Sequence, residues 1–267
     1  MTEKLHKGFK QVGIIIEDNP VLQKLLSLTQ LEDEKIKQQF ELFLMDLLLG
    51  LIRIQGKDLK SFSYYIDKIN ETKGKHNFWG ERFEIFIHHK LLQIDGVLIE
   101  NLRRGIEGKE PDFVFDYNTV GLGIELTSLK FASPPKNEDH IMNKITDTIL
   151  DKNRKTYSGG RCALIVDVTN LVIIERIKGI SLNELFKNKF NGFSYLGKKI
   201  KFGIIILCNS IYKHRPDGSL YNSLNPYLGI MDDSGNIDPY LNSFIRTLFN
   251  NFEPDANSEL NYFHTNI

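Results

Sequence analysis

Two continuous apolar runs, RCALIVDV at residues 161–168 and FGIIILCNS at residues 202–210, constrain the fold more than any other feature of the sequence. Continuous runs of this length are typical of strands buried on both faces of a sheet. Such a sheet needs helices over both faces, and helical patterns at residues 138–157 and 181–188 precede the two runs. The alternation predicts an α/β fold, with a mixed central β-sheet flanked by helices.

The preceding sequence adds a helical region. The first 75 residues carry apolar side chains mainly at helical spacing, and Asn19 followed by Pro20 is typical of a helix start. The polar segment NETKGKHN at residues 70–77 marks a boundary. We therefore expect an N-terminal helical region at residues 1–75 and a second domain at residues 76–267. Further elements of that domain are expected at residues 78–93 (helix), 97–104, 111–117 and 121–129 (strands) and 238–252 (helix).

Charge and hydropathy narrow the classes of partner. Lys plus Arg and Asp plus Glu number 34 each, so any basic surface for nucleic acid has to be local. The most apolar segment, residues 43–54, carries Asp46 and Arg53 and has about half the length of a membrane helix. The N-terminus shows no apolar signal core, and Cys162 and Cys208 lie in apolar runs, as free thiols do in a reducing compartment. We expect a cytoplasmic protein with no membrane partner.

Two acids, Asp112 and Glu125, lie in strands that a turn-like DYNT segment joins. Side chains alternate across a strand, so a hairpin that closes near residues 117–119 lays Asp112 beside Glu125. Two converging carboxylates repel each other, and Mg²⁺ or Mn²⁺, which prefer oxygen ligands, offset that repulsion. The alternative is that each carboxylate is solvated at a strand edge.

A third acid, Glu84, belongs to the helix at residues 78–93. At 100° per residue it falls about 100° from Phe83, on the border of the apolar face, so it can lean towards the sheet. The alternative is a surface glutamate. His88 and His89 are neighbours in the sequence and cannot both point at one metal, so we interpret them as surface or packing residues.

One lysine lies on the apolar side of the next helix. Ile141, Ile145 and Ile149 form an apolar stripe, and Lys152 falls about 20° from Ile141, in the middle of that stripe. A lysine there needs a counter-charge or a water-filled cleft, and the hairpin carboxylates supply both. The alternative is a lysine of the last turn that complements the helix dipole and extends to water.

Residues 78–168, about a third of the chain, resemble the PD-(D/E)xK nuclease superfamily. The resemblance lies in the order of a helix with GERFE, a strand with PDF, a strand with IELT, a helix with KITDTILDKNRKTY and an apolar strand. It implies a restriction-endonuclease-like core in which Glu84 is the helix acid, Asp112 the first strand acid and Glu125 the second.

The chain departs from that family at Thr127, which holds the usual lysine position. Some members are similar in having ExT there and a basic residue from the next helix. The resemblance then implies that Lys152 positions the attacking water or offsets charge on the phosphate, with Lys155 behind it and Thr127 hydrogen-bonded to the same water. Lys130 is the other candidate, if a bulge turns it back to the Glu125 side.

The implied cofactor is Mg²⁺ or Mn²⁺. Asp112, Glu125 and the backbone carbonyl of Leu126 would hold it, and Glu84 would bind a second ion or orient water. Basic side chains near the site would contact flanking phosphates and make binding salt-dependent, unless they are simply solvated. They are Arg103, Arg104, Lys130, Arg154 and Lys155.

The predicted function is hydrolysis of phosphodiester bonds in DNA by a metal-dependent endonuclease of restriction or phage defence, and RNA stays open as a substrate. The alternative is a catalytically inactive nucleic-acid-binding or protein-assembly module on the same fold. A partner protein of a defence system is expected. The leucine-rich residues 43–52 fit a homodimer interface and fit an internal core equally well.

Overall fold

The computed structural model describes residues 2–71, 78–129, 131, 135–155, 157, 159–171, 185, 200–210, 212–214, 220–222, 224–230, 237–250 and 262–263. The chain divides into two compact units, one of residues 1–93 with 211–222 and one of residues 94–210 with 223–267. The boundary expected at residue 75 therefore differs from this division over residues 76–93. The reason is that helix α5 (Phe78–Leu91) packs against helices of the N-terminal region.

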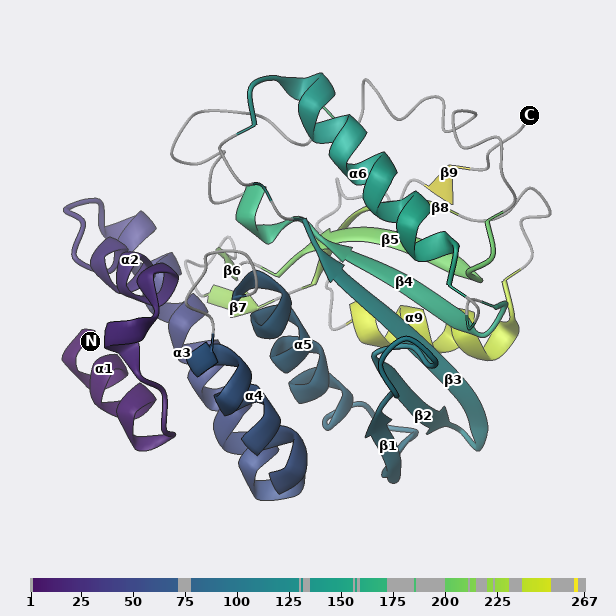
Figure 1. The fold of residues 1–267 in the computed structure, drawn as a ribbon, viewed down its shortest axis with the longest axis horizontal. Helices are drawn as coiled ribbons and strands as arrows, with labels where there is room; N and C mark the ends of the chain where they lie inside the picture. The colour runs from purple at the N-terminus through teal and green to yellow at the C-terminus, as the bar shows by residue number, and fades with distance from the viewer. Residues whose placement is uncertain are drawn as a thin grey trace. The chain divides into compact units, whose positions relative to one another are not determined.

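The first unit is a helical assembly around α3, which packs against α1, α2, α4 and α5 (Figure 1). Asn19 caps α2, accepting a hydrogen bond from the Leu22 N–H, and Pro20 is the first helical residue, as expected. Within the leucine-rich segment, Leu44, Leu47 and Leu51 are buried whereas Leu49 is half exposed. The elements are α1 (Thr2–Gln11), η1 (Ile16–Asp18), α2 (Pro20–Leu28), α3 (Glu34–Lys57), α4 (Leu59–Glu71), α5, β6 (Tyr212–His214) and β7 (Leu220–Asn222).

The second unit contains a mixed sheet, so the predicted α/β class is confirmed. Its strand order is β1-β2-β3-β4-β5-β8-β9, with β3, β4 and β5 parallel to one another and β1, β2 and β3 antiparallel. Every residue of β4 and β5 is buried, as expected of their continuous apolar runs. The elements are β1 (Val97–Arg104), β2 (Phe113–Tyr117), β3 (Val120–Ser128), α6 (Glu138–Asn153), β4 (Cys162–Asp167), β5 (Ile204–Asn209), β8 (Asn225–Ile230), α9 (Pro239–Asn250) and β9 (Tyr262–Phe263).

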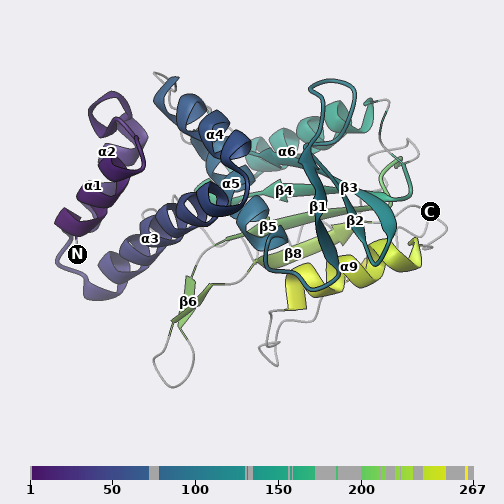
Figure 2. The same ribbon diagram turned by 90° about the horizontal axis from the view of Figure 1, so that it is seen from below.

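Helices α6 and α9 cover opposite faces of this sheet (Figure 2). On the α9 face, the Phe244 ring packs on the rings of Phe115 and Tyr117, at centroid distances of 4.8 and 5.5 Å. The β2–β3 hairpin closes through Asn118 and Thr119, which both have positive φ, at the turn that the sequence predicted. Positive φ at both central residues is typical of a two-residue turn that matches strand twist.

Two helices expected from the sequence differ from the structure or lie outside the residues it describes. Helix α6 ends at Asn153 rather than continuing to residue 157, because the Arg154 N–H already turns back to the carbonyls of Asp151 and Lys152. The helix expected at residues 181–188 lies, apart from Leu185, outside the described residues. None of the helices within the described ranges combines the length and the hydropathy that crossing a bilayer requires.

Candidate functional site

Asp112 and Glu125 face each other across the β2–β3 hairpin. The register pairs Phe113 with Ile124, and one further step along it sets Asp112 opposite Glu125. The Leu126 N–H donates a 2.6 Å hydrogen bond to Asp112 Oδ2, so the Asp112 side chain reaches the backbone of β3 directly beside Glu125. The Glu125 side chain is only 3% exposed, which places a carboxylate in the protein interior. A buried charge of this kind requires partners.

Lys152 supplies the first partner of Glu125. Its Nζ lies 2.5 Å from Glu125 Oε1, and its side chain is 23% exposed. Helix α6 places it there because Ile141, Ile145 and Ile149 are buried against the sheet and Lys152 follows one turn later on the same side. The structure thus brings together the lysine and the carboxylate that the helical periodicity predicted to meet.

Tyr157 supplies the second partner, and sequence reasoning gave it no role. Its hydroxyl donates a 2.9 Å hydrogen bond to Glu125 Oε2, so the two oxygens of Glu125 meet donors from a single stretch of chain. Tyr157 lies beyond the end of α6, where side-chain periodicity no longer predicts direction. The only sequence signal was an aromatic hydroxyl in a short polar connection that returns to the sheet at Cys162.

The negative charges of Asp112 and Glu125 raise the pKa of three neighbouring groups, Lys152, Tyr157 and Cys162. Burial opposes the charge of Lys152, but the carboxylates of Glu125 and Asp112 outweigh it and raise the pKa of the ammonium. Burial and the Glu125 charge also raise the pKa of the Tyr157 phenol, and they raise the pKa of the Cys162 thiol to about 12. Lys152 therefore stays protonated at neutral pH, and the phenol and the thiol stay neutral.

Gly123 and Pro111 help to fix Asp112 in this place. A Cβ at Gly123 would lie 2.7 Å from Pro111 Cγ and 3.3 Å from Cys162 Sγ, so the glycine permits the proline to pack closely on β3. Thr127 is half-buried and follows Glu125 on the same face of β3 by strand alternation. Its predicted hydrogen bond to a water stays a prediction, as does the ligand role of the Leu126 carbonyl.

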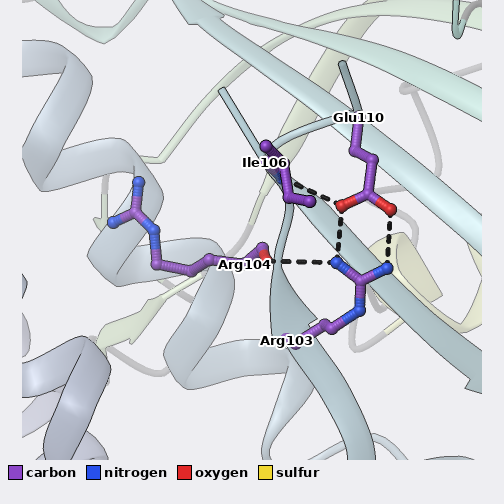
Figure 3. Close-up of polar contacts among 4 residues, drawn as sticks. All are labelled: Arg103, Arg104, Ile106 and Glu110. Atoms are coloured by element: carbon purple, nitrogen blue, oxygen red, sulfur yellow. Dashed lines mark hydrogen bonds and ion pairs between the residues drawn. The ribbon is translucent and has the colours of Figure 1, made fainter. Parts of the chain in front are cut away.

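The predicted phosphate contacts fall into different environments. Arg103 is engaged by Glu110, with its Nη1 and Nη2 2.6 and 2.7 Å from the two carboxylate oxygens (Figure 3). The Ile106 N–H donates to the same carboxylate, while the Arg104 side chain points away from the pair. The Arg103 bonds, followed by the Ile106 bond, lower the pKa of Glu110 to about 2. Much of the Arg103 charge is thus already offset within the chain.

The remaining predicted residues are distributed as follows. Arg154 is exposed and Lys155 half-buried just after α6, close in sequence to Lys152, and Lys130 lies outside the described residues. Glu84 belongs to α5 in the helical unit, so its participation stays a prediction. His88 and His89 are buried, consistent with a packing role, and the His88 Nδ1 lies 3.3 Å from the Tyr65 hydroxyl.

The carboxylate oxygens of Asp112 and Glu125 are ligands of the type that a hard divalent cation prefers. Within the described part of the chain, no group of three or more His, Cys, Asp or Glu side chains is arranged to hold a metal ion. Mg²⁺, however, is commonly bound through one or two carboxylates with waters and substrate phosphates completing the shell. Asp112 and Glu125 provide such a pair, and an ionised carboxylate offers about four acceptor positions, more than the contacts described above use at Glu125.

Comparisons with protein-family models, curated proteins and solved structures find no match for this chain. Function is therefore inferred from the geometry of four side chains: Asp112, Glu125, Lys152 and Tyr157.

Proposed function

We propose that the chain is a Mg²⁺-dependent endodeoxyribonuclease of the PD-(D/E)xK kind with its lysine displaced to α6. One observation carries the proposal: Lys152, from the helix after the hairpin, contacts Glu125 beside Asp112. A carboxylate that is 3% exposed needs an opposite charge, and here that charge comes from the helix after the hairpin, as the displaced-lysine variant of the family implies. Burying the Glu125 charge is costly, and clusters of buried charges with perturbed pKa values concentrate at functional sites.

Asp112, Glu125 and the Leu126 carbonyl would hold the metal. When bound, a divalent cation polarises the phosphoryl oxygen and lowers the pKa of a coordinated water. Lys152 keeps its proton, so it acts as a donor to a phosphate oxygen or to the attacking water rather than as a general base. Thr127, on the same face of β3, would orient that water through its hydroxyl.

Basic groups around the site would bind the DNA backbone. Arg154 and Lys155 lie two and three residues after Lys152, and Arg104 and Lys130 flank the hairpin in sequence. Contacts of this type fix the orientation of the duplex without reading its sequence, and they weaken as salt concentration rises. Arg103 contributes less, because Glu110 already holds it.

The test is cleavage of plasmid DNA and of single-stranded RNA by the full chain, with Mg²⁺, Mn²⁺ or chelator. Asp112→Asn is expected to lower metal-dependent DNA cleavage about a thousandfold, because it removes a metal-binding carboxylate. Asp116→Asn is the matched control, since Asp116 lies on the same face of β2 and accepts a hydrogen bond from Asn101. Wild-type rates for Asp112→Asn would refute the site, and cleavage of RNA alone would change the substrate.

One observation favours a second candidate, an inactive nucleic-acid-binding or assembly module. Both oxygens of Glu125 already accept hydrogen bonds, one of them from an ammonium group that offsets the charge. This module would bind DNA equally well in chelator and in Mg²⁺ and would yield no product with either metal. Gel-shift and cleavage assays on the same samples separate the two candidates.

We also propose a role in restriction or phage defence, with a partner protein and a homodimer as the assembly. The partly exposed leucine-rich helix α3 supports the homodimer, since Leu49 is 50% and Ile52 47% exposed. Cys162 and Cys208 are buried and are not in a disulfide, which supports a reducing, cytoplasmic location. Light scattering of the purified chain tests the dimer, and an unchanged monomer mass at high protein concentration would exclude it.

A further inference from the structure

The second donor to Glu125 has a different chemical character from the first. Lys152 brings a positive charge, which both holds the carboxylate and offsets it. Tyr157 brings a neutral hydroxyl, which holds the other oxygen at 2.9 Å without removing negative charge. Since the Glu125 side chain is only 3% exposed, water contributes little to its orientation. Its direction therefore depends on these protein donors.

We propose that Tyr157 is a positioning residue that orients Glu125 and so sets the affinity of the site for a divalent cation. This inference rests on the proposed function, because it takes Glu125 as a metal ligand. Hydrogen-bond partners behind a metal ligand fix its orientation, and their loss typically weakens metal binding by about tenfold to a hundredfold. A neutral donor suits this task, since it leaves the carboxylate its full charge for the cation.

The geometry of the hydrogen bond supports this assignment, because the Tyr157 hydroxyl donates to Glu125 Oε2 while Lys152 occupies Oε1. The bond also spans 32 residues of sequence, which ties the connection after α6 to the middle of β3. Tyr157 is thus placed to hold Glu125 without taking part in bond cleavage.

The experiment compares Tyr157→Phe with the wild-type full chain. Mn²⁺ binding is measured by electron paramagnetic resonance without DNA, and cleavage rate is measured against Mg²⁺ concentration. Tyr157→Phe is expected to weaken Mn²⁺ binding and to raise the half-saturating Mg²⁺ concentration by about tenfold each, with the saturated rate within about threefold of wild type. A merely structural role would not separate metal affinity from the saturated rate in this way.

Tyr117→Phe is the matched control. It removes a phenol hydroxyl from the same unit, where Tyr117 lies 3.1 Å from the Thr247 hydroxyl on the α9 face. We expect it to leave Mn²⁺ affinity unchanged. p-Aminophenylalanine in place of Tyr157 keeps a neutral N–H donor at the reach of the phenol oxygen and should lose less than about threefold in affinity. It also carries the test if the Phe variant does not fold.

The outcomes separate the two proposals. A wild-type chain that binds Mn²⁺ and cleaves DNA, beside a folded Tyr157→Phe chain of equal Mn²⁺ affinity, overturns the role of Tyr157 alone. A Phe variant with unchanged affinity and a reduced saturated rate also overturns it, because the hydroxyl would then act in the chemical step. A p-aminophenylalanine variant that binds Mn²⁺ as weakly as a folded Phe variant also overturns the role of Tyr157. A wild-type chain that neither binds Mn²⁺ nor cleaves overturns the proposed function.

Discussion

Two buried acids on neighbouring strands are held in contrasting ways. Measured over the whole residue, Glu125 on β3 is 2% exposed and Asp167 on β4 is 1% exposed. The donors to Glu125 are long side chains, Lys152 and Tyr157, from the end of α6 and the connection after it. Asp167 instead accepts a 2.9 Å hydrogen bond from the Ser128 hydroxyl and bonds from both the hydroxyl and the N–H of Thr169.

The difference separates a carboxylate that can exchange partners from one that cannot. The short side chains around Asp167 belong to the ends of strands, and the Thr169 hydroxyl also accepts from the Ser210 N–H, so the network joins β3, β4 and β5. Moving one member would leave several buried groups unsatisfied. Lys152 can instead turn away on its long side chain, which leaves Glu125 Oε1 available to a cation while Tyr157 holds Oε2.

Within this comparison, the largest expected effect comes from removing Lys152, the charged donor to Glu125. Lys152→Met should slow DNA cleavage about a hundredfold at saturating Mg²⁺, because the ammonium no longer offsets charge developing on the phosphate. Lys144→Met, two turns earlier on α6, is the control and should cleave at the wild-type rate. Single-turnover cleavage of a supercoiled plasmid measures both. Equal rates for Lys152→Met and wild type would remove Lys152 from the mechanism.

The second effect sharpens the comparison through stability. Asp167→Ala should lower the free energy of unfolding by about 3 kcal/mol, because it removes the buried acceptor that the Ser128 hydroxyl, the Thr169 hydroxyl and the Thr169 N–H share. Glu125→Gln should cost about 1 kcal/mol or less, since the partly exposed Lys152 ammonium can turn to water and Tyr157 keeps an acceptor. Urea unfolding at pH 7 measures both variants. Equal losses would show that the two acids have the same structural role.

The positions of Asp112, Glu125 and Lys152 could be predicted from local periodicity in the sequence, whereas the position of Tyr157 could not. Alternation along two strands and a turn at residues 117–119 predicted that Asp112 and Glu125 face each other, and helical spacing predicted that Lys152 lies on the sheet side of α6. These relations depend on a few neighbouring residues. The α/β class followed in the same way from the continuous apolar runs of β4 and β5.

Tyr157 and the Asp167 network were missed because no regular period governs them. Tyr157 lies in an irregular connection, so its direction depends on where the chain returns to β4. The hydrogen bond of Ser128 to Asp167 requires the parallel register that pairs these two residues, and a single sequence does not fix the register of distant strands. The Arg103–Glu110 pair likewise depends on how the loop between β1 and β2 closes.

The smallest expected effect concerns that exposed ion pair. The pKa of Glu110 is lowered from 4.5 to about 2 by Arg103 and the Ile106 N–H, so its contribution to stability is fully present above about pH 4.5 and is lost as pH falls through about 2. Glu110→Gln should therefore be less stable than wild type at pH 6, and the gap should close as pH falls from 4.5 towards 2. Urea midpoints of both proteins across this range measure it. A gap independent of pH would mean that the carboxylate charge contributes nothing. Lys152 differs from this exposed pair, because burial opposes its charge and the carboxylates of Glu125 and Asp112 outweigh burial and raise the pKa of the ammonium.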